Sequence, residues 1–212
     1  MKQAASFFIL LFIMLFLPQP AAQAAERQRA SLVVIFVDRA TNSDGEKQWI
    51  VDRVQTFLQG KVNGIYDITP GKVFELRVKS LDLATGSDEK TLFAILGESG
   101  ADYALLAELV SAKESGSMGL FRSSKNANIG LNIKILDLVN CGYLKQGRFT
   151  GRAVDDNAVI SIGDRLVAIL FLNSCEITEK ALEKLLFQAG EIVSVNLPLG
   201  KPVKRLTGQS AI

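Results

Sequence analysis

Residues 31–37 form a continuous apolar run, Ser-Leu-Val-Val-Ile-Phe-Val, that is rich in β-branched side chains. A strand with one exposed face alternates apolar and polar residues. A continuous run of this length is typical of a strand buried on both faces. The segment therefore predicts a strand inside a sheet that is covered on both sides, and this requirement constrains the fold more than any other feature of the chain.

The rest of the chain continues as alternating strands and helices and then changes to consecutive strands. After residues 31–37, the expected elements are a helix over 48–60, a half-buried strand over 74–78, a helix over 88–96, strands over 102–112, 129–135 and 143–153, and helices over 159–169 and 176–189. This order is β-α-β-α-β-β-β-α with one more helix. It predicts an α/β (α+β) fold in which a single mixed β-sheet is packed with helices.

The amino terminus has the pattern of a secretory signal peptide. Lys2 precedes an apolar run from Phe7 to Leu17, and an Ala-rich segment follows that ends near Ala24. The run would span only about 16 Å as a helix, about half of a bilayer's hydrocarbon thickness, so no permanent membrane span is expected. We therefore expect residues 1–24 to be a signal peptide cleaved near Ala24, 25–192 to be one domain, and 193–212 to be a carboxy-terminal tail. The protein is expected to be exported, either periplasmic or secreted.

Composition excludes several kinds of chemistry. The chain has no histidine and only two cysteines, so it has no histidine-based catalytic triad, no histidine-ligated zinc or haem and no four-thiolate metal site. The 24 Lys and Arg against 22 Asp and Glu give a net charge of +2, too small to indicate a nucleic-acid binder. No cofactor and no metal are expected.

Four segments carry a resemblance to a known family. Leu32–Phe36 is similar to the strand of a first β-α unit, and Gly100–Leu109 to a Gly-Ala-Asp-Tyr segment that leads into a strand. Asn128–Asp137 and Gly142–Arg152 are similar to a closing hairpin. Together these segments resemble the envelope superfamily of the curli secretion channel and the TolB amino-terminal domain, which includes activators of penicillin-binding proteins.

The resemblance implies an envelope protein that binds other components and is not an enzyme. Similar domains are secretion-pore subunits, periplasmic modules that hold other envelope proteins, and lipoproteins that activate cell-wall synthases. This chain lacks the lipid-attachment cysteine of the lipoprotein members, and its turn reads Leu-Val-Asn-Cys-Gly over residues 138–142 where relatives usually carry a Thr-Gly type of turn.

Cys141 and Cys175 suggest a disulfide if the chain is exported. A strand leaving Cys141 and a helix over 157–173 returning toward it would bring Cys175 close. The bridge would contribute about 3–4 kcal/mol to stability. The alternative is a pair of reduced cysteines.

The segment 113–126 reads as a long Ser/Gly-rich loop between two strands, and it carries Met118, Leu120 and Phe121. Apolar side chains in an exposed loop are typical of a partner-docking element. The alternative is that Leu120 and Phe121 fold back onto a helix.

Lys134, Arg148 and Arg152 are expected to share one exposed face of the sheet, with Thr150 between the two arginines. Such a basic face could meet peptidoglycan, anionic lipid or an acidic protein. The alternative is a solvated face with no binding role.

The sequence therefore predicts an exported, non-enzymatic interaction domain that binds an envelope protein or a cell-wall component, with a homo-oligomer left open. One alternative is a carboxylate-based hydrolase of the cell wall or of polysaccharide, which needs two carboxylates in one cleft, roughly 5–10 Å apart. Another is a small-ligand-binding domain, which needs a sizeable apolar pocket.

Overall fold

A computed structural model of the chain describes residues 29–40, 48–83, 86–118, 122–158 and 174–204. The predicted signal peptide and the predicted helix over 159–169 lie outside these residues. The described elements are β1 (Ser31–Asp38), α2 (Gln48–Val62), β2 (Asp67–Pro70), α3 (Lys72–Lys79), α4 (Glu89–Gly97), β3 (Tyr103–Met118), β4 (Arg122–Asp137), β5 (Gly142–Ala158) and α6 (Ser174–Asn196). Among the helices built from these residues, none is both long and apolar enough to cross a membrane.

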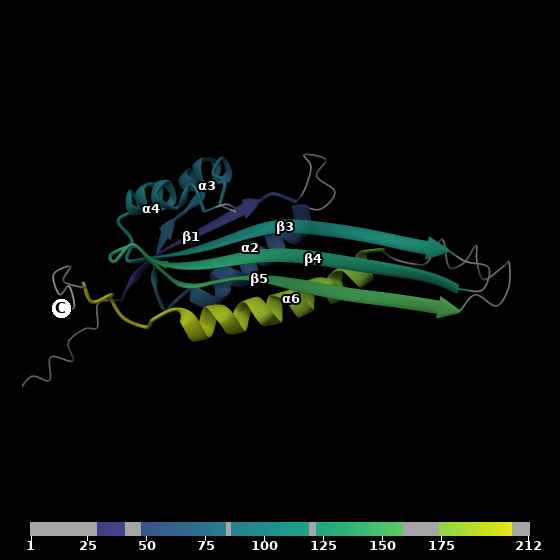
Figure 1. Cartoon of the computed structure of the whole chain (residues 1–212). Coiled ribbons are helices and arrows are strands. Elements are labelled where there is room, and N and C mark those ends of the chain that lie inside the picture. Colours follow the sequence, from purple (N-terminus) through teal and green to yellow (C-terminus); the bar gives the residue numbers. More distant parts are fainter. Residues whose placement is uncertain (1–28, 41–47, 84–85, 119–121, 159–173, 205–212) are drawn as a thin grey trace, which may run out of the picture.

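One mixed sheet organises the molecule (Figure 1). Its strand order is β2-β1-β3-β4-β5, in which β1 pairs in parallel with β2 and β3, and β3, β4 and β5 pair as antiparallel neighbours. Five strands and four described helices in this arrangement confirm the predicted fold class.

Strand β1 is buried on both faces, as the apolar run predicts. Leu32, Val34 and Phe36 belong to the core that α2 and α6 cover. The alternate residues, which include Val33 and Ile35, pack with residues of α3 and α4 on the opposite face. Strand β1 thus lies within the sheet that forms the central layer of a helix–sheet–helix sandwich.

The half-buried strand predicted for residues 74–78 is wrong, because these residues belong to helix α3. Phe74 and Val78 are four residues apart, so the same apolar positions fit a helical period as well as an alternating one. Val78 is fully buried, whereas Leu76 is 80% exposed. The second strand is instead the short polar edge strand β2, which ends at Pro70.

The loop predicted over residues 113–126 is also wrong for its described part. Lys113 pairs with Asn128, Met118 pairs with Ser123, and the residues between them continue the β3–β4 ladder. Serine and glycine are weak strand formers in isolation, but a hairpin anchored by a packed sheet can extend through them. Figure 1 shows β3, β4 and β5 running well beyond α3 and α4, while α6 follows the extension on one side.

The chain beyond α6 is attached to the rest of the domain through hydrogen bonds at Pro198 and Gly200. Helix α6 runs four residues past the predicted domain boundary at 192. The hydroxyl of Tyr66 donates to the carbonyl of Pro198 at 2.8 Å, and that of Tyr103 donates to the carbonyl of Gly200 at 2.9 Å. Burial, with Asp137 and Asp102 nearby, raises the pKa of Tyr103 to about 12, so this hydroxyl keeps its proton.

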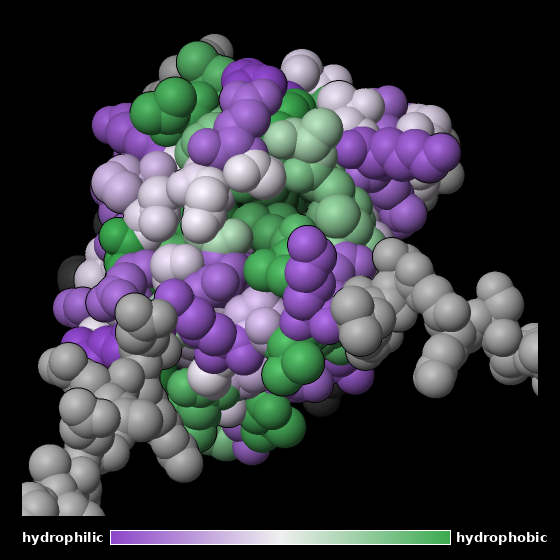
Figure 2. All heavy atoms as spheres, turned by 90° about the vertical axis from the view of Figure 1, so that its left-hand side faces the viewer, coloured by the Kyte–Doolittle hydropathy of each residue, from purple (hydrophilic) through white to green (hydrophobic). Residues whose placement is uncertain are grey.

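Figure 2 looks onto the end of the molecule at which this carboxy-terminal segment lies. Small hydrophobic patches there are separated by hydrophilic side chains. This view shows no broad apolar face of the kind that marks a large protein–protein interface.

Candidate functional site

A buried ion-pair network lies where β1 ends beside the middle of β3, near α3. Glu108 is 3% exposed, and its carboxylate accepts a hydrogen bond from Nε of Arg39 at 2.9 Å. The Lys134 ammonium lies 3.9 Å from the other carboxylate oxygen. The Arg39 guanidinium also donates to the carbonyls of Lys79, Val78 and Leu81, at 2.9, 3.3 and 3.0 Å. Arg39 therefore ties the end of β1 to the end of α3 and to β3.

This network forms part of the wall of a cleft of about 560 Å³ that also contains Asp82. The cleft holds two carboxylates, which the hydrolase alternative requires. Glu108, however, already lies between two cations and is almost fully buried, so it is not presented to a substrate. The contacts of Glu108 give it a structural role.

The predicted basic residues lie on one face of the sheet. Asn132 pairs with Arg148, Asn128 pairs with Arg152, and Lys134 lies two residues from Asn132 on the same side. Lys134 differs from the two arginines, because its side chain is only 12% exposed and also donates to the carbonyl of Leu83. Arg148 and Arg152 remain exposed.

Lys113 joins this face, which the sequence interpretation missed by placing it in a loop. Lys113 pairs with Asn128, so Lys113, Asn128 and Arg152 form one row across β3, β4 and β5. Strand alternation through residues 113–118 was the signal that could have placed it there.

The predicted docking element stays a prediction. Met118 is the last residue of β3, and its side chain lies outside the description. Leu120 and Phe121 also fall outside the described residues. Of this element, the structure thus describes only the position of Met118 at the end of β3.

The predicted disulfide between Cys141 and Cys175 stays a prediction, although the described backbone places the two residues in different elements. Cys141 is an exposed free thiol in the β4–β5 turn, where it adopts a positive φ of 49°. Cys175 belongs to the first turn of α6. That helix packs with Ala181 against Gly151, which lies about 30 Å along β5 from the turn, and it begins at Ser174, seven residues before Ala181. A disulfide needs Cα atoms closer than about 7 Å.

We expect two free thiols in the denatured protein. Helix α6 would have to leave the sheet for Cys175 to reach Cys141, so alkylation without a reducing agent should label both cysteines. Mass spectrometry of the labelled chain gives the count, and a sample reduced first provides the fully labelled control. Labelling only after reduction would contradict the structural placement.

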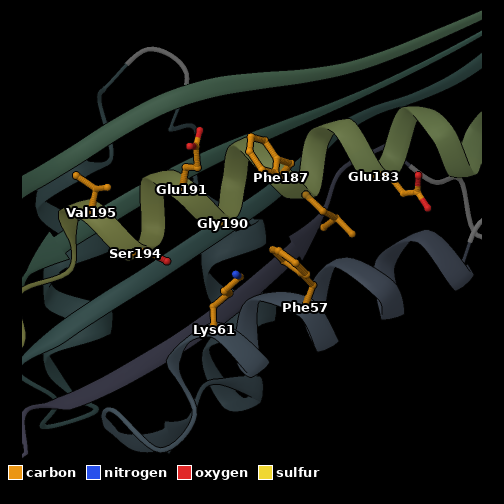
Figure 3. Close-up of a pocket in the computed structure, with 9 residues that line it drawn as sticks. Phe57, Lys61, Glu183, Phe187, Gly190, Glu191, Ser194 and Val195 are labelled. Carbon is orange, nitrogen blue, oxygen red and sulfur yellow. The ribbon is translucent and has the colours of Figure 1, made fainter.

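An exposed apolar groove lies between α2 and α6 (Figure 3). It has a volume of about 500 Å³, and Phe57 and Lys61 project into it from α2 toward α6. Gly190 lets the helices approach, because a Cβ there would lie 3.0 Å from the Phe57 ring. Lys61 Nζ lies 5.3 Å from the centre of that ring, a cation–π contact.

The outer wall of the groove carries large apolar side chains that the described structure leaves uncovered. Phe187 is 68% exposed and Val195 is 80% exposed. Glu183 and Glu191 belong to the same wall. The sequence interpretation missed this groove. The sequence indicates the groove in one way: α6 has more apolar residues than a single buried stripe needs, namely Leu182, Leu185, Leu186 and Phe187.

No protein-family model matches the chain, and no curated protein matches it either. Solved structures with similarity include a lipoprotein from Neisseria meningitidis (16% identity, 69% of this chain and 96% of that chain, TM-score 0.37). Others are a minor lipoprotein from Acinetobacter baumannii (9% identity, 79% and 94%, TM-score 0.37) and the PelC dodecamer from Paraburkholderia phytofirmans (12% identity, 84% and 91%, TM-score 0.36).

These similarities carry no argument about what this chain binds, because all three TM-scores lie below 0.5. The resemblance to the curli-channel and TolB superfamily stays a prediction. The function must therefore be argued from the chain's own surfaces.

Proposed function

We propose that this protein is an exported, non-enzymatic interaction domain of the cell envelope that binds a helical segment of a partner protein in the α2–α6 groove. The signal-peptide pattern of residues 1–24 supports export. The exposure of Phe187 and Val195 beside a groove between two helices carries the proposal of binding. The carboxylate-hydrolase alternative has no such support, because Glu108 is held by Arg39 and Lys134.

The apolar side chains supply the affinity. Full burial of a large apolar side chain contributes about 1.5–3 kcal/mol, so covering Phe187 and Val195 gives a favourable contribution of several kcal/mol before the cost of association. Phe57 is half-buried at the base of the groove and offers a ring for a partner side chain to contact. A central aromatic anchor with an uncovered neighbour is typical of a protein-binding hot spot.

The groove's shape and charge indicate what the partner presents. Two helices lying side by side form a groove into which the side-chain ridge of a third helix can pack. Glu183 and Glu191 are eight residues apart on α6, so their backbones lie about 12 Å apart along one rim. We therefore expect an amphipathic helix that carries apolar anchors with basic residues about two turns apart.

A site-specific crosslinker tests the proposal. With a photoreactive amino acid at Ser194 in the groove wall, we expect one discrete adduct in cells, because a bound helix would cover this position. Phe187→Ser should remove the adduct, and Glu191→Lys should weaken it by opposing the partner's basic residues. Mass spectrometry of the adduct identifies the partner segment.

Val73→Ser is the matched control, because Val73 is 77% exposed on α3, on the other side of the sheet. It removes an exposed apolar side chain without touching the groove and should leave the adduct unchanged. Equal loss in both variants, or an adduct that persists in Phe187→Ser, would reject the groove as the docking site. An adduct with a second copy of this chain would identify self-association there instead of a separate partner.

A further inference from the structure

The face of β3, β4 and β5 that points away from α6 forms a second, chemically different surface. The helices α3 and α4 cover only its beginning, where Ala104, Leu106 and Leu136 are buried. Beyond them no helix that the structure describes covers the face, and we call the part around Lys113, Arg148 and Arg152 the basic face. Its neighbouring side chains are amides and hydroxyls, including Asn128 and Thr150. The described part of the basic face carries no aromatic residue.

The three cations of the basic face make no ion pair within the described residues. Lys113, Arg148 and Arg152 are all exposed. Strand geometry places the backbones of Arg148 and Arg152 about 13 Å apart along β5, and those of Lys113 and Arg152 about 10 Å apart across two strand spacings. The nearby buried carboxylate, Glu108, is already neutralised by Arg39 and Lys134. Among the side chains of β3, β4 and β5 that the structure describes on this face, Glu108 is the one carboxylate, so the three cations have no acidic partner there.

Charge is distributed unevenly between the two sides of the sheet. Helix α6, on the opposite side, exposes four glutamates against two lysines, Lys180 and Lys184, and Lys180 is paired with Glu176; the glutamates are Glu176, Glu179, Glu183 and Glu191. The chain's net charge is only +2, so the protein as a whole has little attraction for anions. A molecule polarised in this way approaches a negatively charged surface in one orientation, with the basic face toward it.

We propose that the basic face docks onto the phosphate groups of an anionic lipid surface. A guanidinium binds phosphate through two parallel N–H donors, and Arg148 and Arg152 present two such groups from one rigid strand. The face is an exposed stretch of sheet with polar neighbours, which lets both guanidinium groups meet an array of headgroups. A protein partner would need central apolar anchors, and Val154, 48% exposed, is the one large exposed hydrophobic residue in the described part of this face.

Vesicle co-sedimentation tests this proposal with the chain from residue 25 onward, the form expected after removal of the signal peptide. The probes are vesicles of phosphatidylcholine alone and vesicles with about one third phosphatidylglycerol. Each surface cation near an anionic membrane contributes roughly fivefold to partitioning, so Arg148→Gln with Arg152→Gln should weaken binding to the anionic vesicles roughly 30-fold. Wild-type binding should fall as salt rises, because screening shortens the reach of these charges.

Lys90→Gln with Lys145→Gln is the matched control. Both lysines are exposed, Lys90 lies on α4, and Lys145 lies on β5 but points to the other face of the sheet. This double variant loses the same charge and should keep most of the binding. Every variant begins at residue 25, so the apolar run of the expected signal peptide contributes nothing to adsorption.

Two results would overturn the lipid proposal. The first is equal binding of wild-type protein to neutral and anionic vesicles, or equal loss in the two double variants. The second is no vesicle binding together with arginine-dependent binding to a soluble acidic polypeptide, which would assign the basic face to an acidic macromolecule. Thermal melting of each variant confirms that the comparison is between folded proteins.

Discussion

Replacing Glu108 by alanine should lower the free energy of unfolding by about 3 kcal/mol. The substitution removes the only carboxylate that faces both Arg39 and Lys134 in the described network and leaves two cations beside each other in a partly closed cleft. The Lys134 side chain is 12% exposed and that of Arg39 is 29% exposed, so solvent compensates for only part of the loss. Urea unfolding followed by circular dichroism measures the change.

The ion pair between Arg77 and Glu98 provides the control for this prediction. Both of its side chains are about half exposed, at 47% and 54%. Water and salt screen such a pair, so Glu98→Ala should barely change stability. If Glu108→Ala cost no more than Glu98→Ala, the buried network would not hold the end of α3 in place. Arg39→Ala combined with Glu108→Ala should cost less than the sum of the two single changes, because the residues share one interaction.

Patterns that demand burial predicted the fold well. The apolar run in β1 has no exposed face, so it fixes a central strand with cover on both sides, as the structure shows. The alternation of Ile129, Leu131, Ile133 and Ile135 against polar residues likewise placed β4 with one buried face. In both segments many side chains must be buried at once, and only the two-residue period of a strand buries all of them.

Segments with few apolar residues were predicted less well, because their conformation depends on distant contacts. Residues 72–79 fit either period, and the choice is made by where Val78 can be buried against β1. Residues 113–118 became strand because they extend an anchored hairpin and because Thr178 of α6 contacts Glu114. Neither contact can be seen in the local sequence.

The basic face and the α2–α6 groove also differ in how well the sequence predicts them. Alternation along β4 and β5 was enough to predict that Arg148 and Arg152 share a face. The α2–α6 groove depends on how two helices, more than a hundred residues apart in the chain, cross at Gly190. The sequence shows that α6 has excess apolar residues, but it does not show which of them the crossing leaves exposed.

Gly151→Ala should destabilise the protein by about 3 kcal/mol, a large effect for a single methyl group. A Cβ at this position of β5 would lie 1.9 Å from the Ala181 carbonyl oxygen and 2.9 Å from Leu185 Cβ. The first of these atoms belongs to the backbone of α6 and cannot rotate away. The helix must therefore move off the sheet, and this movement opens the core that Leu182 and Leu185 help to fill.

Gly60→Ala separates this steric effect from the general consequence of adding a methyl group. Gly60 lies within α2, and a Cβ there meets nothing within 4 Å. Alanine also favours a helix over glycine, so this variant should be more stable than wild type by about 0.5–1 kcal/mol. Urea midpoints that move in opposite directions for the two variants would support close contact of α6 with β5. An unchanged midpoint for Gly151→Ala would mean that α6 does not rest on this strand, and the α2–α6 groove would then lose the support that holds its outer wall.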